Sequence, residues 1–475
     1  MVYGDSAVNF IQPNFFIFLL IFAIVYNFAG QRARLGVGLL FSLYFYAYFS
    51  PVYSLLLLIS SAVDFGVGAA MGRCDQPRHR RGWLILSLVA NLGLLAAFKY
   101  SAFFWNSYAQ LVGGVDLMIA EPPPMGISFF TFQTLSYTID IYRGELKPCR
   151  SFRQFLFFIS FFPQLVAGPI VRARDFLPQI QSSRLLWPEL QPCLWRFARG
   201  FAKKACLADS LGLLLVDPVY ANPQSASSMA CALAVVAYGL QLYLDFSGYS
   251  DMAIALGRVF GFTFPENFNY PYLAKSFSEF WRRWHISLSS WLRDYLYISL
   301  GGNRRGLTRT LANLMLTMLL GGLWHGAGWN FVIWGGLNGG YLALETLSGF
   351  PRRLQGRWGA LLGHSWVLGG YFFSLIFFRA SCFGDACAVI TKLGELRPSH
   401  FAPWWASMGQ FSQWQVLGLL GIAMSTHIFH GLEGLRLRYA KAVWEMKAFF
   451  IVVLGFCLLH FYPSGKVAAF IYFQF

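Results

Sequence analysis

Long apolar runs separated by short basic stretches follow one another along the whole sequence. A helix needs about 20 apolar residues to cross the hydrocarbon core of a bilayer, and these runs approach that length. The pattern therefore predicts an all-α, polytopic transmembrane helical bundle of about 10–11 spans, with additional re-entrant and interfacial helices, in a single domain over residues 1–475. Predicted spans include residues 13–29, 35–49, 52–71, 83–98, 126–142, 226–246, 366–378, 414–429 and 448–461.

Three stretches interrupt this pattern. Residues 155–170 are apolar but short and contain Pro163 and Pro169, which is as typical of a re-entrant or interfacial segment as of a span. Residues 172–204 mix apolar and basic positions and predict helices at the cytoplasmic surface. Residues 245–305 contain no apolar run long enough to cross, so we expect this stretch at the cytoplasmic face.

The run 310–344 has no Asp, Glu, Lys or Arg and contains one histidine, His325. Basic residues flank it on both sides, which favours a helical hairpin that enters and leaves at the cytoplasmic face, with His325 near its deep end. Whether the two arms form a re-entrant hairpin or two full spans stays open, because the run is short for two crossings.

Composition and charge support a membrane protein. The chain has 475 residues, of which 56% are hydrophobic and 12% charged, and its net charge is +16. The Lys and Arg residues lie in short loops, as the positive-inside rule predicts, so the charge does not indicate nucleic-acid binding. This distribution places the loops 72–82 and 434–447 in the cytoplasm and the N-terminus on the opposite side. No internal repeat is visible, which argues against many transporter folds.

His325 is the first candidate for chemistry. Ionisable groups at membrane depth are costly and usually functional, and an imidazole can accept and donate protons near neutral pH. Its neighbours are glycines and tryptophans, so Trp324 and Asn330 are candidate supporting residues. The alternative is a packing histidine that is hydrogen-bonded to a neighbouring carbonyl.

A second candidate region runs from residue 277 to 297. Aromatic and apolar residues recur there at helical spacing and predict one amphipathic interfacial helix, with His285 on its apolar face. His285 is a candidate catalytic residue or, alternatively, incidental to an amphipathic helix. Candidate donor-binding residues on the same stretch are Trp281, Arg282, Arg283, Trp284 and Arg293.

The arginines of this region can hold the phosphates of an anionic donor such as a coenzyme A thioester. They can equally contact lipid headgroups. Asp245 and Asp251 are supporting candidates that either orient this region or pair with Arg258 or Arg282. The eight cysteines form no CxxC pair or Cys/His set with metal spacing, so the sequence predicts no metal site.

Several long blocks of the sequence resemble the bacterial branch of the membrane-bound O-acyltransferase (MBOAT) family, whose members acetylate alginate, cellulose and peptidoglycan. The resemblance extends over nearly the whole chain. The blocks are Phe161-Phe-Pro-Gln-Leu-Val-Ala-Gly-Pro-Ile170, Tyr243-Leu-Asp-Phe-Ser-Gly-Tyr-Ser-Asp-Met252, Pro265-Glu-Asn-Phe268, Glu279-Phe-Trp-Arg-Arg-Trp-His-Ile-Ser-Leu288, Trp291-Leu-Arg-Asp-Tyr-Leu-Tyr297, Gly301-Gly-Asn-Arg304, Gly322-Leu-Trp-His-Gly-Ala327 and Phe470-Ile-Tyr-Phe-Gln-Phe475.

The resemblance implies the MBOAT fold, a helical bundle with a tunnel, and two functional histidines at His285 and His325. It implies a bacterial inner-membrane enzyme that uses acetyl-CoA as its donor substrate and binds no cofactor. In such an enzyme the charge pattern of the loops places the N-terminus in the periplasm. The expected partners are a periplasmic acetyltransferase or esterase-like protein and a polysaccharide synthesis and export complex. Since no Ser/His/Asp or Cys/His arrangement is visible, direct transfer is favoured over an acyl-enzyme.

Other functions remain as alternatives at this point. D-alanyl transfer to a cell-envelope polymer would use the same fold, because fold alone does not determine the acyl group. A channel or transporter would use His325 as a gate or proton relay. A structural scaffold of an export complex would need neither histidine.

Overall fold

A computed structural model describes residues 10–49, 51–113, 117–119, 122–351, 356–397, 416, 418–421, 424 and 470–471. Within these ranges the chain is helical and has no strand, which confirms the all-α prediction. The helices are α1 (Pro13–Phe28), α2 (Gln31–Phe49), α3 (Pro51–Gly72), α4 (Pro77–Leu95), α5 (Ser101–Val112), α6 (Ile127–Arg143), α7 (Phe152–Ser160), α8 (Phe162–Leu165), α9 (Ala173–Phe176), α10 (Leu190–Phe201), α11 (Asp209–Leu211), α12 (Asp217–Ala221), α13 (Ser228–Val259), α14 (Phe277–Arg283), α15 (Ile286–Trp291), α16 (Leu307–His325), α17 (Trp329–Ser348), α18 (Gly356–Arg379) and α19 (Phe383–Gly394).

Shorter helical segments join some of these helices. The π-helical segments are Ala96–Tyr100, Ala202–Ala208, Gly212–Val216 and Leu292–Tyr297, and the 3₁₀ segments are Leu177–Gln181, Trp187–Glu189 and Pro271–Leu273.

The predicted spans 414–429 and 448–461 and the loop 434–447 lie outside the described residues, apart from a few positions before residue 425.

Four helices in the described part of the chain are long and apolar enough to cross a membrane: α3, α13, α18 and the continuous helix Pro77–Val112. The last of these consists of α4, the π-helical segment Ala96–Tyr100 and α5. The helix α1 is apolar but shorter. These helices make the chain a multi-pass integral membrane protein. The total of about 10–11 spans stays a prediction.

The chain forms two compact units. The first contains Met1–Ala198 and Tyr249–Glu266, and the second contains Arg199–Gly248 and Asn267–Phe475. The single domain over residues 1–475 stays a prediction.

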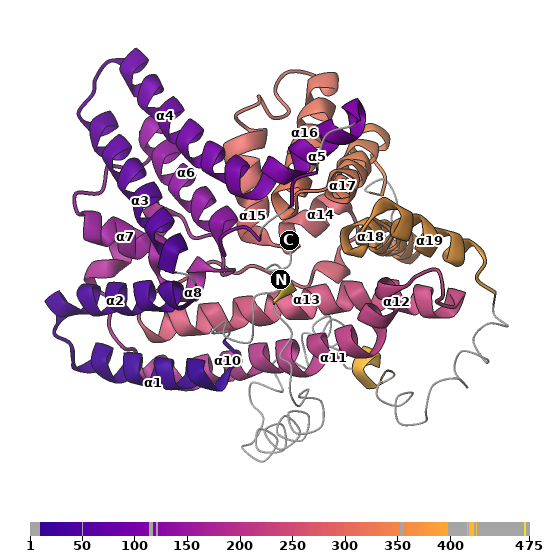
Figure 1. The fold of residues 1–475 in the computed structure, drawn as a ribbon, viewed down its shortest axis with the longest axis horizontal. Helices are drawn as coiled ribbons and strands as arrows, with labels where there is room; N and C mark the ends of the chain where they lie inside the picture. The colour runs from indigo at the N-terminus through magenta and orange to yellow at the C-terminus, as the bar shows by residue number, and fades with distance from the viewer. Residues whose placement is uncertain are drawn as a thin grey trace. The chain divides into compact units, whose positions relative to one another are not determined.

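In the first unit, α3, α4 and α6 pack against one another (Figure 1). A buried polar cluster joins them: the Asp64 carboxylate accepts hydrogen bonds from Ser87 Oγ (2.6 Å) and Asn91 Nδ2 (2.8 Å). Asn91 Oδ1 in turn accepts from Thr134 Oγ1 at 3.0 Å. Polar groups inside a helical bundle are stabilising only when they are matched in this way.

The apolar stretch 155–170 does not form a span. It contains α7 and α8, which have 9 and 4 residues and are separated at Phe161. Residues 155–165 of these two helices are buried inside the first unit. This agrees with the re-entrant or interfacial alternative, because two such short helices cannot cross a bilayer.

Several helices run beyond their predicted ends, and two of these regions contain residues near the site. The expected span 226–246 continues to Val259 as the 32-residue helix α13, so the start of the stretch 245–305 is helical. Ser247, Ser250 and Asp251 lower the local hydropathy, which is why the sequence pattern ended the span too early. All three side chains are buried, and the helix continues past them to Val259. Residues 190–221 are also helical without a break, whereas the sequence predicted surface helices only as far as residue 204.

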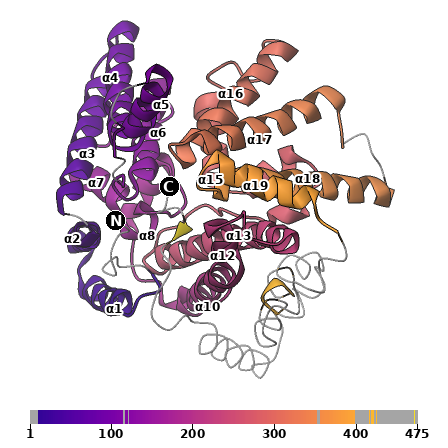
Figure 2. The same ribbon diagram turned by 45° about the vertical axis from the view of Figure 1, so that its right-hand side comes forward.

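In the second unit, α16 and α17 form the predicted hairpin (Figure 2). They have 19 and 20 residues, which corresponds to about 28–30 Å each at 1.5 Å per residue. Gly322 and Gly335 face the opposite helix so closely that a Cβ at either position would collide with its backbone. The hairpin therefore depends on small residues at its contact, as is typical of membrane helices.

Candidate active site

His325 is the last residue of α16, where the hairpin turns, and its side chain is buried with 4% exposure. Three aromatic rings pack around its imidazole. The ring centroids of Trp324 and Trp334 are 5.0 Å away and that of Phe378 is 5.3 Å away. Trp334 belongs to α17 and Phe378 to α18, so three helices build this environment. Gly326 follows His325 because a Cβ there would collide with the ring of Phe331.

His285 lies at a break between helices. The prediction of one continuous amphipathic helix over residues 277–297 is wrong: α14 ends at Arg283, α15 begins at Ile286, and His285 has φ 42° and ψ 55°. The left-handed region is unfavourable for a residue with a Cβ, and such residues concentrate at functional sites. Periodicity could not reveal this break, because the aromatic spacing continues across it.

Asn267 holds this break in place, and the sequence reasoning missed its role. Its backbone carbonyl accepts from Ile286 N at 2.9 Å, and its side-chain oxygen accepts from Ser287 Oγ at 2.9 Å. Ser289 Oγ donates to the Trp284 carbonyl at 2.9 Å on the other side of the turn. These bonds compensate for the backbone groups that the break removes from the helix.

The two candidate histidines, which lie in separate sequence blocks, meet around Trp324. The Trp324 ring centroid is 5.9 Å from that of His285 and 5.0 Å from that of His325. Phe246 of α13 packs edge-on against His285 at 4.5 Å. Burial lowers the pKa of His285 well below its usual value, and the nearby His325 acts in the same direction. A neutral imidazole can accept a proton, as acid–base catalysis requires.

The supporting candidates Asn330, Asp245 and Asp251 each have a different partner. Asn330 Nδ2 donates to the Ala380 carbonyl at 3.0 Å and so ties the start of α17 to the end of α18. Asp245 is 2.5 Å from Lys204 Nζ, while Asp251 accepts from Arg196 Nε at 3.0 Å. The structure thus pairs these aspartates with Lys204 and Arg196, whereas one of the two sequence alternatives had named Arg258 or Arg282.

Lys204 is a further residue that the sequence reasoning missed. Its side chain is 2% exposed and its Nζ lies 2.7 Å from Asp209 as well as 2.5 Å from Asp245. Asp245 Oδ2 also accepts from Ile471 N at 3.1 Å. The residue that follows Asp245 is Phe246, which packs against His285, so this buried ion-pair network supports one wall of the histidine site.

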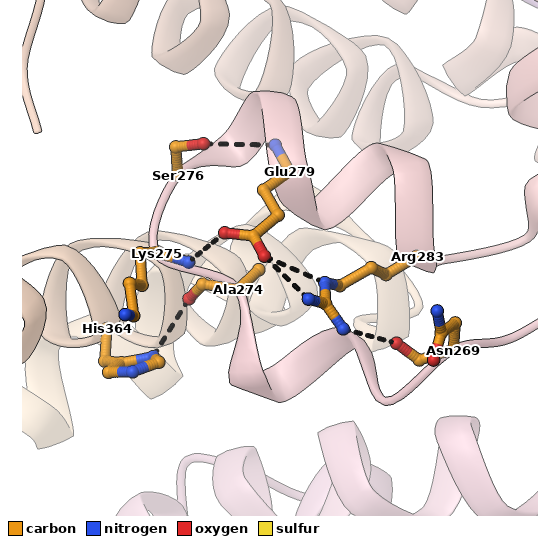
Figure 3. A network of polar contacts seen from close by, with 7 residues as sticks. All are labelled: Asn269, Ala274, Lys275, Ser276, Glu279, Arg283 and His364. Atoms are coloured by element: carbon orange, nitrogen blue, oxygen red, sulfur yellow. Dashed lines mark hydrogen bonds and ion pairs between the residues drawn. The ribbon is translucent and has the colours of Figure 1, made fainter. Parts of the chain in front are cut away.

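The three candidate arginines differ from one another in their partners and in their exposure. Figure 3 shows that Arg283 is held by Glu279, with Nη2 2.8 Å from Oε1, and that its Nη1 donates to the Asn269 carbonyl at 3.1 Å. Burial acts against the charged form of Glu279, but the Lys275 amide and Arg283 lower the pKa of this carboxyl. Arg282 is exposed, and Arg293 is exposed and paired with Asp294 at 2.7 Å. Arg282 and Arg293 are thus the more accessible cations.

An interfacial helix would place the tryptophans of this stretch against lipid headgroups. In the structure they pack against other aromatic rings of the protein instead. Trp284 is 2% exposed and packs between Phe280 and Tyr371. Trp281 packs against Trp334 with ring centroids 5.8 Å apart. Trp281 therefore belongs to the surroundings of His325, through Trp334.

Comparison with known proteins identifies the family. Residues 127–358 match the MBOAT family, membrane-bound O-acyltransferase. The peptidoglycan O-acetyltransferase of Helicobacter pylori is 33% identical over 459 residues, which cover 90% of this chain and 84% of that protein. The chain belongs to the membrane-bound O-acyltransferase family.

Two further relatives describe the range of this family. The probable alginate O-acetylase AlgI of Pseudomonas aeruginosa is 43% identical over 341 residues, which cover 70% of this chain but only 65% of that protein. The teichoic acid D-alanyltransferase of Streptococcus thermophilus is 32% identical over 229 residues, or 45% of this chain and 55% of that protein. The MBOAT match includes both histidines, and the resemblance seen in the sequence is confirmed.

Proposed function

We propose that this chain is an O-acetyltransferase that takes acetyl from a cytoplasmic thioester, acetyl-CoA, for the O-acetylation of an exported polysaccharide of the alginate or cellulose type. The alginate and peptidoglycan acetylating relatives support acyl transfer to a polymer. The single observation that carries the catalytic assignment is the meeting of His285 and His325 around Trp324.

In this mechanism, His325 accepts the proton of the acceptor hydroxyl while the oxygen attacks the thioester carbonyl. The tetrahedral intermediate then collapses, the carbon–sulfur bond breaks, and the thiolate takes the proton back from His325. His285 positions one of the two substrates or shares the proton. The aromatic surroundings of His325 favour transfer over hydrolysis, because they exclude water from the reacting groups.

Donor binding involves Arg282 and Arg293 in this proposal, since both are exposed. Guanidinium groups bind phosphates through paired, charge-assisted hydrogen bonds. Arg283 contributes indirectly by holding α14 through Glu279. The acetyl group is passed to a periplasmic acetyltransferase or esterase-like partner in the polysaccharide export complex.

The test is acceptor-dependent release of CoA. Inverted membrane vesicles that contain the full chain receive radiolabelled acetyl-CoA from outside, on the cytoplasmic face. Alginate oligosaccharides, the acceptor probe, are enclosed with the periplasmic acetyltransferase or esterase-like partner in the lumen, which is the periplasmic side. We expect label in the oligosaccharides and an equal amount of free CoA, and we expect neither with His325→Gln. No acceptor-dependent release from the wild-type chain would overturn the proposal.

The relationship to teichoic acid D-alanyltransferases favours D-alanyl transfer as the second candidate. The same vesicles are supplied with a D-alanyl carrier-protein thioester in place of acetyl-CoA. Transfer of D-alanine without transfer of acetyl would select this candidate. Ion flux through reconstituted protein, with no thioester cleavage, would indicate the channel alternative.

The proposed location is the bacterial inner membrane, with the N-terminus in the periplasm. Cys74 lies between α3 and α4 and is partly exposed, so it is a natural label for the predicted cytoplasmic loop 72–82. A membrane-impermeant maleimide should label Cys74 in inverted vesicles and not in intact spheroplasts. The opposite result would invert the topology.

A further inference from the structure

Two buried indole N–H groups, one on a ring that packs on His325 and one on the ring behind it, have no hydrogen-bond partner within the described part of the chain. They belong to Trp281 of α14 and Trp334 of α17. Trp334 is 3% exposed, and its ring meets His325 nearly at a right angle, with centroids 5.0 Å apart. Buried donors in folded proteins are nearly always paired, so a donor left over beside a candidate catalytic group needs an explanation.

Trp366 shows the ordinary arrangement in the same unit. Its indole N–H donates to Glu345 Oε1 at 3.1 Å, and the carboxylate also accepts from backbone amides at the start of α14. The fold is therefore able to pair a partly buried indole with an acceptor where its role is structural. Trp281 and Trp334 are in contact with each other, with ring centroids 5.8 Å apart, yet neither N–H is bonded to any residue that the structure describes.

The chemistry of acyl transfer requires donors at this location. Attack on a thioester carbonyl moves an electron pair onto the carbonyl oxygen, and the resulting oxyanion is stabilised by preorganised hydrogen-bond donors. Trp324, Trp334 and Phe378 pack directly on His325, so the ring of Trp334 brings an indole N–H close to the candidate base. An indole N–H is a donor that cannot act as an acceptor, which suits an anionic oxygen.

We propose that the indole N–H groups of Trp334 and Trp281 are the oxyanion donors of acyl transfer. The inference rests on the proposed function. The oxyanion forms when the deprotonated acceptor oxygen attacks, and the two N–H groups donate to it. As the carbonyl re-forms, the carbon–sulfur bond breaks and the thiolate takes the proton from His325.

The test compares Trp334→Phe and Trp281→Phe with wild type in the vesicle assay, with acetyl-CoA varied. Loss of one oxyanion donor lowers kcat about 10²–10³-fold, and KM for acetyl-CoA should change less than about twofold. Trp366→Phe is the matched control, since it removes an indole N–H whose bond is structural, and its kcat should stay within about threefold of wild type.

A binding measurement separates a catalytic role from a structural one. Trifluoroacetonyl-CoA is a ketone analogue whose carbonyl carbon becomes tetrahedral by adding water. Trp334→Phe should bind it about 100-fold more weakly than wild type, in line with the kcat effect. Acetonyl-CoA, which remains a planar ketone, should bind nearly as tightly as in wild type. If Trp334→Phe fails to accumulate in the membrane, benzothienylalanine at position 334 removes the N–H and preserves the ring.

The outcomes are distinct. An inactive wild-type chain would refute the proposed function and this inference together. An active wild type with an active Trp334→Phe, or equal loss of affinity for both analogues, would overturn the oxyanion role alone. A kcat loss with selective loss of the tetrahedral analogue would support it.

Discussion

The polar cluster around Asp64 and the surroundings of His325 are two ways of burying polar groups among helices. In the cluster, donors and acceptors are matched: Asp64 accepts from Ser87 and Asn91, and Asn91 accepts from Thr134. Around His325 three aromatic rings pack closely, and the Trp334 N–H has no partner among the described residues.

The difference suggests a division of roles between stability and chemistry. A fully matched network stabilises one arrangement of helices and leaves no hydrogen-bond donor or acceptor for a substrate. A site that keeps donors unmatched is less stable but can give them to a transition state. Both regions contain buried ionisable side chains, so burial alone does not distinguish a structural site from a catalytic one.

The largest expected effect is at His325. His325→Ala should lower kcat about 10²–10⁴-fold, because the acceptor hydroxyl loses its base. The amount of protein in the membrane should stay near that of wild type, as the side chain mainly contacts other rings. Vesicle assays and quantitative blotting measure the two properties. Wild-type polymer acetate in this variant would refute the catalytic assignment.

Asp64→Ala should have the opposite profile. It removes the carboxylate that accepts from the Ser87 hydroxyl and the Asn91 amide, at a cost of about 1–3 kcal/mol for each hydrogen bond that is not replaced. Thermal unfolding in detergent should show the loss, and Asp64→Asn should lose less because it retains one acceptor oxygen. The kcat of the folded fraction should be unchanged. A loss of kcat without a loss of stability would instead give Asp64 a functional role.

The arginine variants should have the smallest effects. Loss of one charged contact costs about 1.5–3 kcal/mol, so Arg282→Ala and Arg293→Ala should each raise KM for acetyl-CoA about 10- to 150-fold with kcat nearly intact. Arg283→Ala should in addition lower stability, because Arg283 is bound to Glu279. Steady-state kinetics separate these cases. A fall in kcat at constant KM in Arg282→Ala would exclude a role in donor binding.

Hydrophobic patterning predicted the parts of this protein that depend on local sequence. The bounds of α1, α3 and α6 agree with the predicted spans to within about one residue, because a continuous apolar run in a membrane can only be satisfied by a helix. The hairpin of α16 and α17 followed from an uncharged run with basic flanks. His325 was recognisable for the same reason, as the only histidine in that run.

Tertiary structure decided what depends on residues far apart in the chain. The break at His285 exists because Asn267 supplies the hydrogen bonds that replace helical ones, and no local pattern encodes that partnership. Lys204 is buried because Asp209 and Asp245 neutralise it, so the hydropathy of residues 202–208 gave no sign of a buried helix. The meeting of both histidines at Trp324 likewise required the packing of α13, α15 and the hairpin, since local sequence determines helices whereas distant contacts determine which side chains share a site.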